Sequence, residues 1–109
     1  MNNFPDHVIS LEEVADDFRK LDNSQRISVL KAIRKTATNP QEKPAGYGTP
    51  LSGNLAGFCK IKLLKYGIRV VYRYQRSING MLLIVIAMRK DDEVYRIAEE
   101  RIKKHRDIF

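Results

Sequence analysis

The stretch Lys60-Ile61-Lys62-Leu63-Leu64-Lys65-Tyr66-Gly67-Ile68-Arg69-Val70-Val71-Tyr72-Arg73-Tyr74 decides the fold. β-branched and aromatic residues alternate with charged ones on both sides of Tyr66-Gly67, which predicts two strands around a tight turn. We expect Tyr66-Gly67 to be a two-residue loop in which the glycine supplies the positive φ angle. The cross-strand pairs that this loop predicts are Lys65–Ile68, Leu64–Arg69, Lys62–Val71 and Lys60–Arg73.

This predicted hairpin has one apolar face and one cationic face, because side chains alternate between the two sides of a strand. The face expected to pack on the core holds Ile61, Leu63, Val70 and Tyr72. The opposite face holds Lys60, Lys62, Arg69 and Arg73. Like charges fixed this close together repel one another, so the cationic face should bind a partner that carries several negative charges.

The length of 109 residues suits a single domain, expected to span residues 1–109. The only cysteine, Cys59, excludes an internal disulfide and suits a reducing compartment. The longest apolar run, Met81 to Met88, is too short to span a membrane, and the N-terminus lacks the pattern of a signal peptide. We therefore expect a cytoplasmic protein with no membrane partner.

The net charge of +7 is concentrated in the middle of the chain. Nine lysines and arginines lie between Lys43 and Lys90, and no aspartate or glutamate lies among them. A basic block of this kind on a sheet indicates a nucleic-acid partner. The alternative is that the charge serves solubility alone.

Two amphipathic helices are predicted before the hairpin. Ser10 and Glu13 have the spacing of a capping box for the first helix, and Asp22-Asn23-Ser24 both ends that helix and caps the second. The second helix should end at Asn39-Pro40. The apolar stripes are Leu11, Val14, Ala15, Phe18 and Leu21 in the first helix, and Ile27, Leu30, Ile33 and Ala37 in the second.

The remaining elements are a short edge strand near residues 7–10, a long loop over residues 41–57, a turn at residues 77–80, a strand buried on both faces at residues 81–88, and a last helix. Leu51 and Leu55 should anchor the loop to the core. The last helix should be capped by Asp91-Asp92 and pack through Val94, Ile97, Ala98 and Ile102. The fold class is therefore α+β, with two N-terminal helices and a C-terminal helix packed on one face of a small antiparallel sheet.

Residues for ordinary hydrolytic chemistry are missing from the sequence. His7 and His105 are isolated from one another and are expected at the surface without partners, and one cysteine with two scattered histidines does not make a metal site. Cys59 lies on the Ile61 face by parity, so we expect a small buried apolar residue there. We predict no cofactor and no metal.

Cations alone can catalyse the cleavage of RNA by its own 2′-hydroxyl. Attack of the 2′-oxygen on the adjacent phosphorus adds negative charge to the phosphoryl oxygens, and fixed cations stabilise that charge. A base is still required, and crowding of Lys62 by Lys60 and Arg69 would favour its neutral amine. The alternative is that Lys62 only binds phosphate. Tyr95, one step off the apolar stripe of the last helix, would either stack on a base or pack at the helix edge.

Five segments of the sequence carry a resemblance to a known family. They are Pro50-Leu51-Ser52-Gly53-Asn54-Leu55-Ala56-Gly57, Lys60-Ile61-Lys62-Leu63, Gly67-Ile68-Arg69-Val70-Val71-Tyr72, Ile84-Val85-Ile86-Ala87-Met88-Arg89 and Glu93-Val94-Tyr95. Together they resemble the RelE/ParE toxins of type II toxin–antitoxin pairs. The resemblance runs from about Leu11 to Ile102 and implies a RelE-like microbial-RNase-type fold that a cognate antitoxin neutralises.

The RelE branch of this family is implied by a set of five residues. Toxins of that branch cut mRNA in the ribosomal A site, with contacts to 16S rRNA and without a metal. The resemblance implies Lys62 as the general base and Arg89 as the general acid, with Lys60 and Arg69 holding the phosphate and Tyr95 stacked on an mRNA base. The further cations expected to bind RNA are Lys65, Arg73, Arg76 and Lys90. The implied partners are an acidic, RelB-like antitoxin and the ribosome with its mRNA.

One feature of the predicted sheet conflicts with that set. A two-residue loop at Asn79-Gly80 would place Arg89 on the opposite face from Arg69, so we expect a longer loop, a β-bulge, or Arg89 in the bend after the strand. Two other functions stay open. One is a ParE-like inhibitor of DNA gyrase without nuclease activity, and the other is an RNA-binding module without catalysis.

Overall fold

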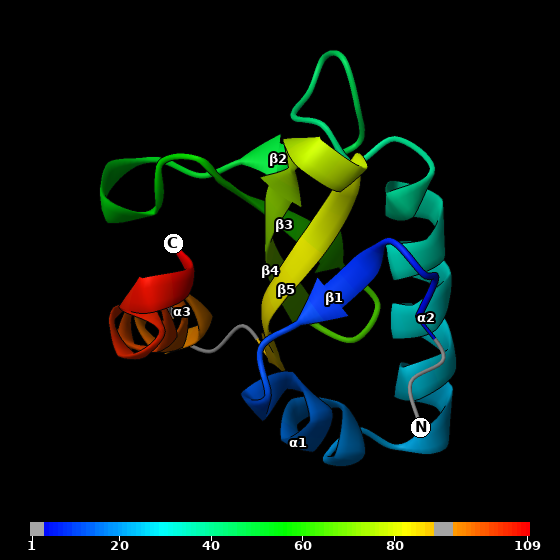
Figure 1. Ribbon diagram of the computed structural model, residues 1–109. Helices are drawn as coiled ribbons and strands as arrows, with labels where there is room; N and C mark the ends of the chain where they lie inside the picture. Colours follow the sequence, from blue (N-terminus) through cyan, green and yellow to red (C-terminus); the bar gives the residue numbers. More distant parts are fainter. Residues whose placement is uncertain (1–3, 89–92) are drawn as a thin grey trace.

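The computed structural model describes residues 4–88 and 93–109, and within them a five-stranded sheet runs through the centre of the molecule (Figure 1). The strand order is β1-β5-β4-β3-β2. The strands are β1 (Val8–Ser10), β2 (Thr49–Pro50), β3 (Phe58–Leu63), β4 (Ile68–Gln75) and β5 (Gly80–Met88). The helices are α1 (Glu13–Arg19), α2 (Asn23–Ala37) and α3 (Glu93–Lys104), with 3-10 turns η1 (Gly53–Leu55), η2 (Arg76–Ile78) and η3 (Arg106–Ile108).

The α+β class predicted from the sequence is confirmed, although the sheet is mixed and not purely antiparallel. β1 pairs with β5 in parallel, and the other three strand pairs are antiparallel. The predicted edge strand near residues 7–10 is therefore present. Its direction follows from its long-range pairing, since Met81 N–H donates to the His7 carbonyl and Leu11 N–H to the Leu83 carbonyl, both at 3.0 Å.

The helices cover both faces of the sheet, which corrects the expectation that they share one face. In Figure 1, α2 lies on one side of the strands and α3 on the other. Alternation along β3 gives the reason. Ile61 lies beside Ala32 and Thr36 of α2, whereas the side chain of Lys60, its neighbour, meets Tyr95 of α3. Both faces of the inner strands are apolar. Each face is therefore covered by a helix, which removes its apolar side chains from water.

The start of α1 differs from the predicted capping box, whereas the start of α2 agrees with its prediction. Ser10 is the last residue of β1, and α1 begins without a side-chain cap. Ser10 is held in the sheet opposite Leu83, so it is not free to cap a helix. Asp22 caps α2 with Gln25, whose backbone N–H donates to Asp22 Oδ1 at 2.9 Å.

The buried faces of the helices agree only in part with the predicted stripes. In α1, Val14 is buried as expected, but Ala15 is exposed and Asp17 is buried. In α2, Ile33 and Ala37 are buried, and Val29 takes the place of Ile27, which is 52% exposed. The stripe of α2 is thus rotated toward Val29, because this helix packs on β3.

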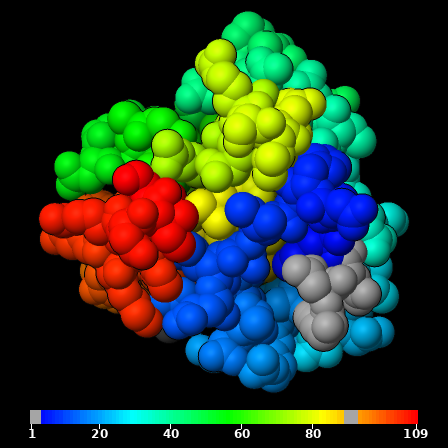
Figure 2. Space-filling view, in the orientation of Figure 1, coloured from blue at the N-terminus to red at the C-terminus, as the bar shows by residue number. Residues whose placement is uncertain are grey.

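The core is centred on β5, which is buried on both faces as its continuous apolar run predicted. Residues 80–86 are buried, and Figure 2 shows that only a small part of β5 reaches the surface between the N-terminal and C-terminal segments. The long loop over residues 41–57 is anchored by Leu55, which is buried, and Leu51, which packs against the core at its side. This loop also contributes β2, which the sequence did not predict. Within residues 4–88 and 93–109, no helix has the length and apolar character needed to cross a membrane.

Candidate active site

The cationic face of the β3–β4 hairpin exists, but its register differs from the predicted one. Lys62 lies opposite Arg69, and Lys60 lies opposite Val71. Leu64–Gly67 form a four-residue turn in which Gly67 has a φ of 66°, so the predicted two-residue loop is wrong. The pairing is shifted by two residues, which leaves every side chain on its predicted face. The shift makes Lys62 and Arg69 direct cross-strand partners on the same face of the hairpin.

The turn is longer because Tyr66 packs against the core and does not sit at the tip of the hairpin. Successive turn hydrogen bonds, from Tyr66 N–H to Leu63 O and from Gly67 N–H to Leu64 O, hold it in place at 3.2 and 3.3 Å. Lys65 projects from this turn, with its ammonium 5.4 Å from the centre of the Tyr66 ring. Lys65 thus lies in the turn that joins the strands of Lys62 and Arg69, and its RNA-binding role stays a prediction.

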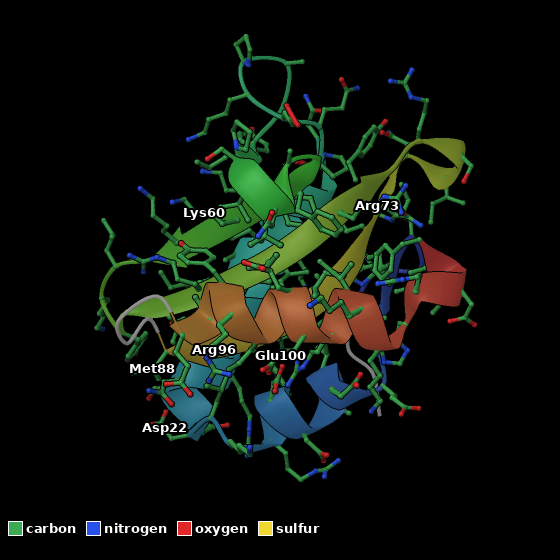
Figure 3. All side chains as sticks on the ribbon, turned by 90° about the vertical axis from the view of Figure 1, so that its left-hand side faces the viewer. Asp22, Lys60, Arg73, Met88, Arg96 and Glu100 are labelled. Atoms are coloured by element: carbon green, nitrogen blue, oxygen red, sulfur yellow. The ribbon has the colours of Figure 1, made fainter. Side chains whose placement is uncertain are left out.

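Tyr95 reaches the same face from the first turns of α3. The Lys60 ammonium lies 5.7 Å from the centre of the Tyr95 ring, a cation–π distance. The ring is partly buried against the core, so the helix-edge packing considered from the sequence is what the structure adopts. Figure 3 looks onto α3, which lies across the face of the sheet that carries Lys60.

Two buried polar atoms at this site have no hydrogen-bond partner among the described residues. They are Arg69 Nε and the Tyr95 hydroxyl oxygen. Another donor of this guanidinium is paired, because Arg69 Nη1 donates to the Ile68 carbonyl oxygen at 3.3 Å. A buried donor without a partner is costly, so unpaired donors beside two lysines are consistent with a site for an anion.

The β-bulge that the predicted site required is present in β5. Between Val71 and Tyr72 the pairing with β5 shifts by one residue, which places Ala87 opposite Arg69. Arg89 and Lys90, predicted as general acid and RNA-binding residue, lie outside the described residues, as does the predicted Asp91-Asp92 cap.

Arg73 and Arg76, two of the predicted RNA-binding residues, lie toward the other end of β4. The Arg73 guanidinium stacks at 5.5 Å from the centre of the Phe109 ring, and Arg76 is exposed in η2. In Figure 3 Lys60 and Arg73 are labelled on opposite sides of the same face. The two arginines line a separate groove of about 770 Å³ together with the loop over residues 41–45. The structure therefore does not unite the whole predicted cation set in one pocket.

Both histidines have partners, which corrects the expectation that neither does. His105 Nε2 lies 3.0 Å from both carboxylate oxygens of Glu13, and His7 Nε2 lies 2.9 Å from the Ala37 carbonyl. Glu12, Glu13 and His105 present ligand atoms within 4.8 Å of one another. The Lys104 ammonium sits 3.0 Å from the same Glu13 carboxylate, which makes this cluster a structural ion pair between α1 and the end of α3.

Cys59 is fully buried opposite Tyr72, as its parity on β3 predicted. Burial raises the pKa of its thiol to about 11. The thiol is thus kept in its neutral form and plays no part in the cationic site.

Three residues that sequence reasoning did not single out lie close to Lys60 and Lys62. Lys35, Lys43 and Tyr47 line a groove that those two lysines share. Lys35 is on the exposed side of α2 and the other two are in a long loop, where periodicity carries no signal of proximity.

Comparisons with known proteins give matches to solved structures. No protein-family model matches the chain, and no curated protein does. The chain is similar to a double mutant of the E. coli toxin RelE in the free state, at 25% identity and a TM-score of 0.71 over 94% of this chain and 99% of that one. It is also similar to the isolated E. coli RelE toxin, at 25% identity and a TM-score of 0.66 over 87% and 96% of the two chains.

A third match, at 19% identity, is to the toxin–antitoxin complex RelBE2 from Mycobacterium tuberculosis, with a TM-score of 0.63 over 75% of this chain and 95% of that chain. At this identity the match bears on the fold alone. The two E. coli matches cover nearly the whole of both chains. Those two matches confirm the RelE resemblance predicted from the sequence.

Proposed function

From its RelE-family fold as premise, we propose that this chain is the toxin of a type II toxin–antitoxin pair and a ribosome-dependent endoribonuclease. The observation that carries the proposal is the opposition of Lys62 and Arg69 across β3 and β4, with Lys60 and Tyr95 beside them. Such a cluster suits a phosphodiester whose charge grows during the reaction. A structural role would not require donors of Arg69 and Tyr95 to be buried without a partner among residues 4–88 and 93–109.

The proposed reaction is an intramolecular transfer at phosphorus. Lys62, as the general base, takes the proton of the 2′-hydroxyl as the 2′-oxygen bonds to the adjacent phosphorus. The bond from phosphorus to the 5′-oxygen breaks, Arg89 gives that oxygen a proton, and a cyclic phosphate remains. Lys60 and Arg69 hold the phosphoryl oxygens, and they are worth most in the transition state, where the charge is largest.

In this proposal the ribosome holds the mRNA in the orientation that the reaction requires, which the isolated protein does not do. Tyr95 would stack on an mRNA base, and the mRNA held in the A site would then present its 2′-hydroxyl in line with the phosphorus. Free RNA samples many conformations, so we expect the protein alone to cut it poorly. The toxin would act in the cytoplasm, on translating ribosomes, with contacts to 16S rRNA.

The proposed antitoxin is an acidic, RelB-like protein. E. coli RelE has been solved in the RelBE toxin–antitoxin complex, and RelBE2 of M. tuberculosis is likewise a toxin–antitoxin complex. The basic block of this chain offers charge complementarity to an acidic partner, which could cover the cationic face or pack on the helices.

The test is cleavage of mRNA on programmed ribosomes, with the new mRNA ends mapped by primer extension. Wild-type protein should cut in the A site. Lys62→Ala should lower the cleavage rate about a hundredfold or more, as expected for loss of a general base. Arg89→Ala should reduce cleavage far more than ribosome binding. The matched control is Lys103→Ala, which removes one exposed lysine of α3 and should cut as the wild type does.

Intact mRNA under these conditions, from protein shown to be folded, would overturn the proposed nuclease. A DNA-damage response to expression, with mRNA intact, would instead favour inhibition of DNA gyrase.

A further inference from the structure

A second basic surface adjoins the candidate active site on the far side of β3. It is a groove of about 320 Å³ between α2, the loop before β2, and β3, and we call it the α2 groove. Its lining includes four lysines, one tyrosine and no carboxylate among the described residues. The charged and aromatic members are Lys35, Lys43, Tyr47, Lys60 and Lys62.

The α2 groove and the active site share Lys60 and Lys62 because β3 is an open edge at this point. β2 pairs only with Cys59 and Lys60, so the segment from Ile61 to Leu63 has no strand beside it on that edge among the described residues. The Lys60 ammonium lies on the α3 side over Tyr95, so Lys60 and Lys62 border the groove at its β3 edge while their charged face belongs to the active site. A strand of nucleic acid leaving the active site past this edge would enter the groove directly.

Tyr47 supplies an aromatic surface inside the groove. Its side chain is 47% exposed, and the Lys35 ammonium lies 5.3 Å from the centre of its ring. An exposed ring flanked by cations is the arrangement with which proteins bind single-stranded nucleic acid, because bases stack on the ring while cations follow the backbone.

The loop that carries Tyr47 and Lys43 is held by hydrogen bonds along its length. Tyr47 N–H donates to the Asn39 carbonyl at 3.0 Å, and Asn39 Nδ2 donates to the Ala45 carbonyl at 2.8 Å. Lys43 N–H donates to the Gly48 carbonyl at 2.8 Å. The Tyr47 ring and the Lys43 ammonium are thus carried by a loop that is ordered by its own hydrogen bonds. Less conformational entropy is lost when such a loop binds a ligand.

We propose that the α2 groove binds single-stranded RNA continuous with the strand cut at Lys62, with phosphates on Lys35 and Lys43 and a base stacked on Tyr47. The identity of that strand as mRNA rests on the proposed function. The binding itself is argued from the groove, whose exposed Tyr47 ring and the lysines Lys35 and Lys43 fit a phosphodiester chain with unpaired bases.

The first experiment measures binding of the full-length protein to a labelled single-stranded 2′-O-methyl RNA of about twelve nucleotides, within the usual site sizes. This probe cannot react, because its 2′-oxygens are blocked. Fluorescence anisotropy at several salt concentrations gives the affinity and its salt slope. Lys35→Ala and Lys43→Ala should each lower the slope by about 0.7, the value for one phosphate contact on a single strand.

Tyr47→Ala should weaken binding by about fivefold or more without changing the salt slope, whereas Tyr47→Phe should bind as the wild type does. Lys103→Ala, on the last turn of α3, is the control for loss of one positive charge, and it should leave the slope unchanged. Thermal melting of each variant shows that it is folded. If folded Lys35→Ala and Lys43→Ala keep the wild-type salt slope, the proposal is overturned. It is also overturned if Lys103→Ala lowers the salt slope by the same amount as they do.

The second experiment asks which RNA occupies the groove. A photoreactive phenylalanine analogue placed at position 47 is activated on programmed ribosomes that carry labelled mRNA. Cross-linking to the mRNA supports the proposal, and cross-linking to ribosomal RNA alone overturns it. A-site cleavage is measured on the same ribosomes. Cleavage without cross-linking to mRNA would overturn the proposal for the groove alone, whereas absence of cleavage would overturn the proposed nuclease.

Discussion

At the scale of single residues, the hairpin beneath the site is fixed by Tyr72. Its hydroxyl donates to the Pro40 carbonyl at 2.8 Å, which ties the end of α2 to β4. Gly48 packs against the same hydroxyl, and a Cβ at this position would lie 2.3 Å from it and 2.9 Å from Cys59 Sγ. Only a residue without a side chain fits there. The loop that carries Tyr47 therefore depends on Gly48 for its place against the sheet.

The thiol of Cys59 should be unreactive in the folded protein. Burial raises its pKa to about 11, so very little thiolate is present at about pH 8. We expect no reaction with a disulfide reagent under native conditions, and one equivalent of reaction after unfolding in guanidinium. The single cysteine makes this stoichiometry unambiguous. Rapid modification of protein that remains folded would contradict the burial of this residue.

At the scale of elements, α1, β5 and α3 are joined by a buried ion pair. Arg101 of α3 donates to both oxygens of Asp17, at 2.6 and 2.9 Å, and also to the Ile84 carbonyl at 3.0 Å. Asp17 Oδ2 accepts the backbone N–H of Ile86 at 3.0 Å. Ile84 and Ile86 lie next to the β-bulge of β5, where backbone groups leave the regular ladder. The pair satisfies these groups and holds α3 over the face that carries Lys60.

Asp17→Asn should destabilise the protein by about 3–5 kcal/mol, the cost of leaving a buried charge without its partner. The side chains of Asp17 and Arg101 are only 8% and 17% exposed, so water cannot replace the lost contact. Urea unfolding measures the difference. The control is Asp16→Asn, whose partner Arg19 is at the surface, and it should cost less than about 1 kcal/mol. Similar small losses in both variants would show that the buried pair contributes little.

A second ion pair between elements makes stability depend on pH. Burial acts to raise the pKa of Glu13, but hydrogen bonds from His105 and Lys104 outweigh it and lower that pKa from 4.5 to about 2. A carboxyl with a lowered pKa in the folded state stabilises the fold above its unfolded pKa. That contribution is lost as the pH falls from 4.5 through about 2.

Glu13→Gln tests this dependence by removing the titrating carboxyl. The difference in unfolding free energy between wild type and Glu13→Gln should be constant at neutral pH and shrink below pH 4.5. Chemical denaturation at a series of pH values measures it. Glu100→Gln, which disrupts an exposed pair with Arg96, is the control and should show a much smaller difference. A difference that grows on acidification would contradict the assigned direction of the pKa shift.

At the scale of the whole molecule, the charge is divided between two regions. The described cations of the central block lie on the loop before β2, on the β3–β4 hairpin and in η2, and acids of α1 and α3 are engaged in pairs such as Glu13–Lys104 and Asp17–Arg101. The net charge of +7 is therefore presented mainly by the surface that we propose for RNA. Such a surface attracts a polyanion from a distance and orients it.

The association rate with ribosomes should consequently fall steeply with salt. We expect a loss of about tenfold or more between about 50 and 300 mM salt, because the ions screen long-range attraction. Stopped-flow mixing with labelled ribosomes measures the rate. The dissociation rate depends on short-range contacts and should change much less. An association rate that is independent of salt would show that the basic surface does not guide the encounter.

The sequence by itself determined the α+β class, the two faces of the central hairpin, the doubly buried strand β5 and the cap of α2. Each of these follows from local periodicity or from residues a few positions apart. Counting residues along the strands also showed that a two-residue loop conflicts with the predicted site, and a bulge was one of the alternatives that this left open.

Only the tertiary structure decided the register of Lys62 with Arg69, the parallel pairing of β1, the placement of helices on both faces and the buried pair of Asp17 with Arg101. It alone brought Lys35, Lys43 and Tyr47 to the edge of β3. These features join residues that are distant in the chain, or depend on how one side chain packs in a turn. Their geometry depends on which apolar surfaces pack against one another in the folded protein. The periodicity of the sequence does not show which surfaces these are.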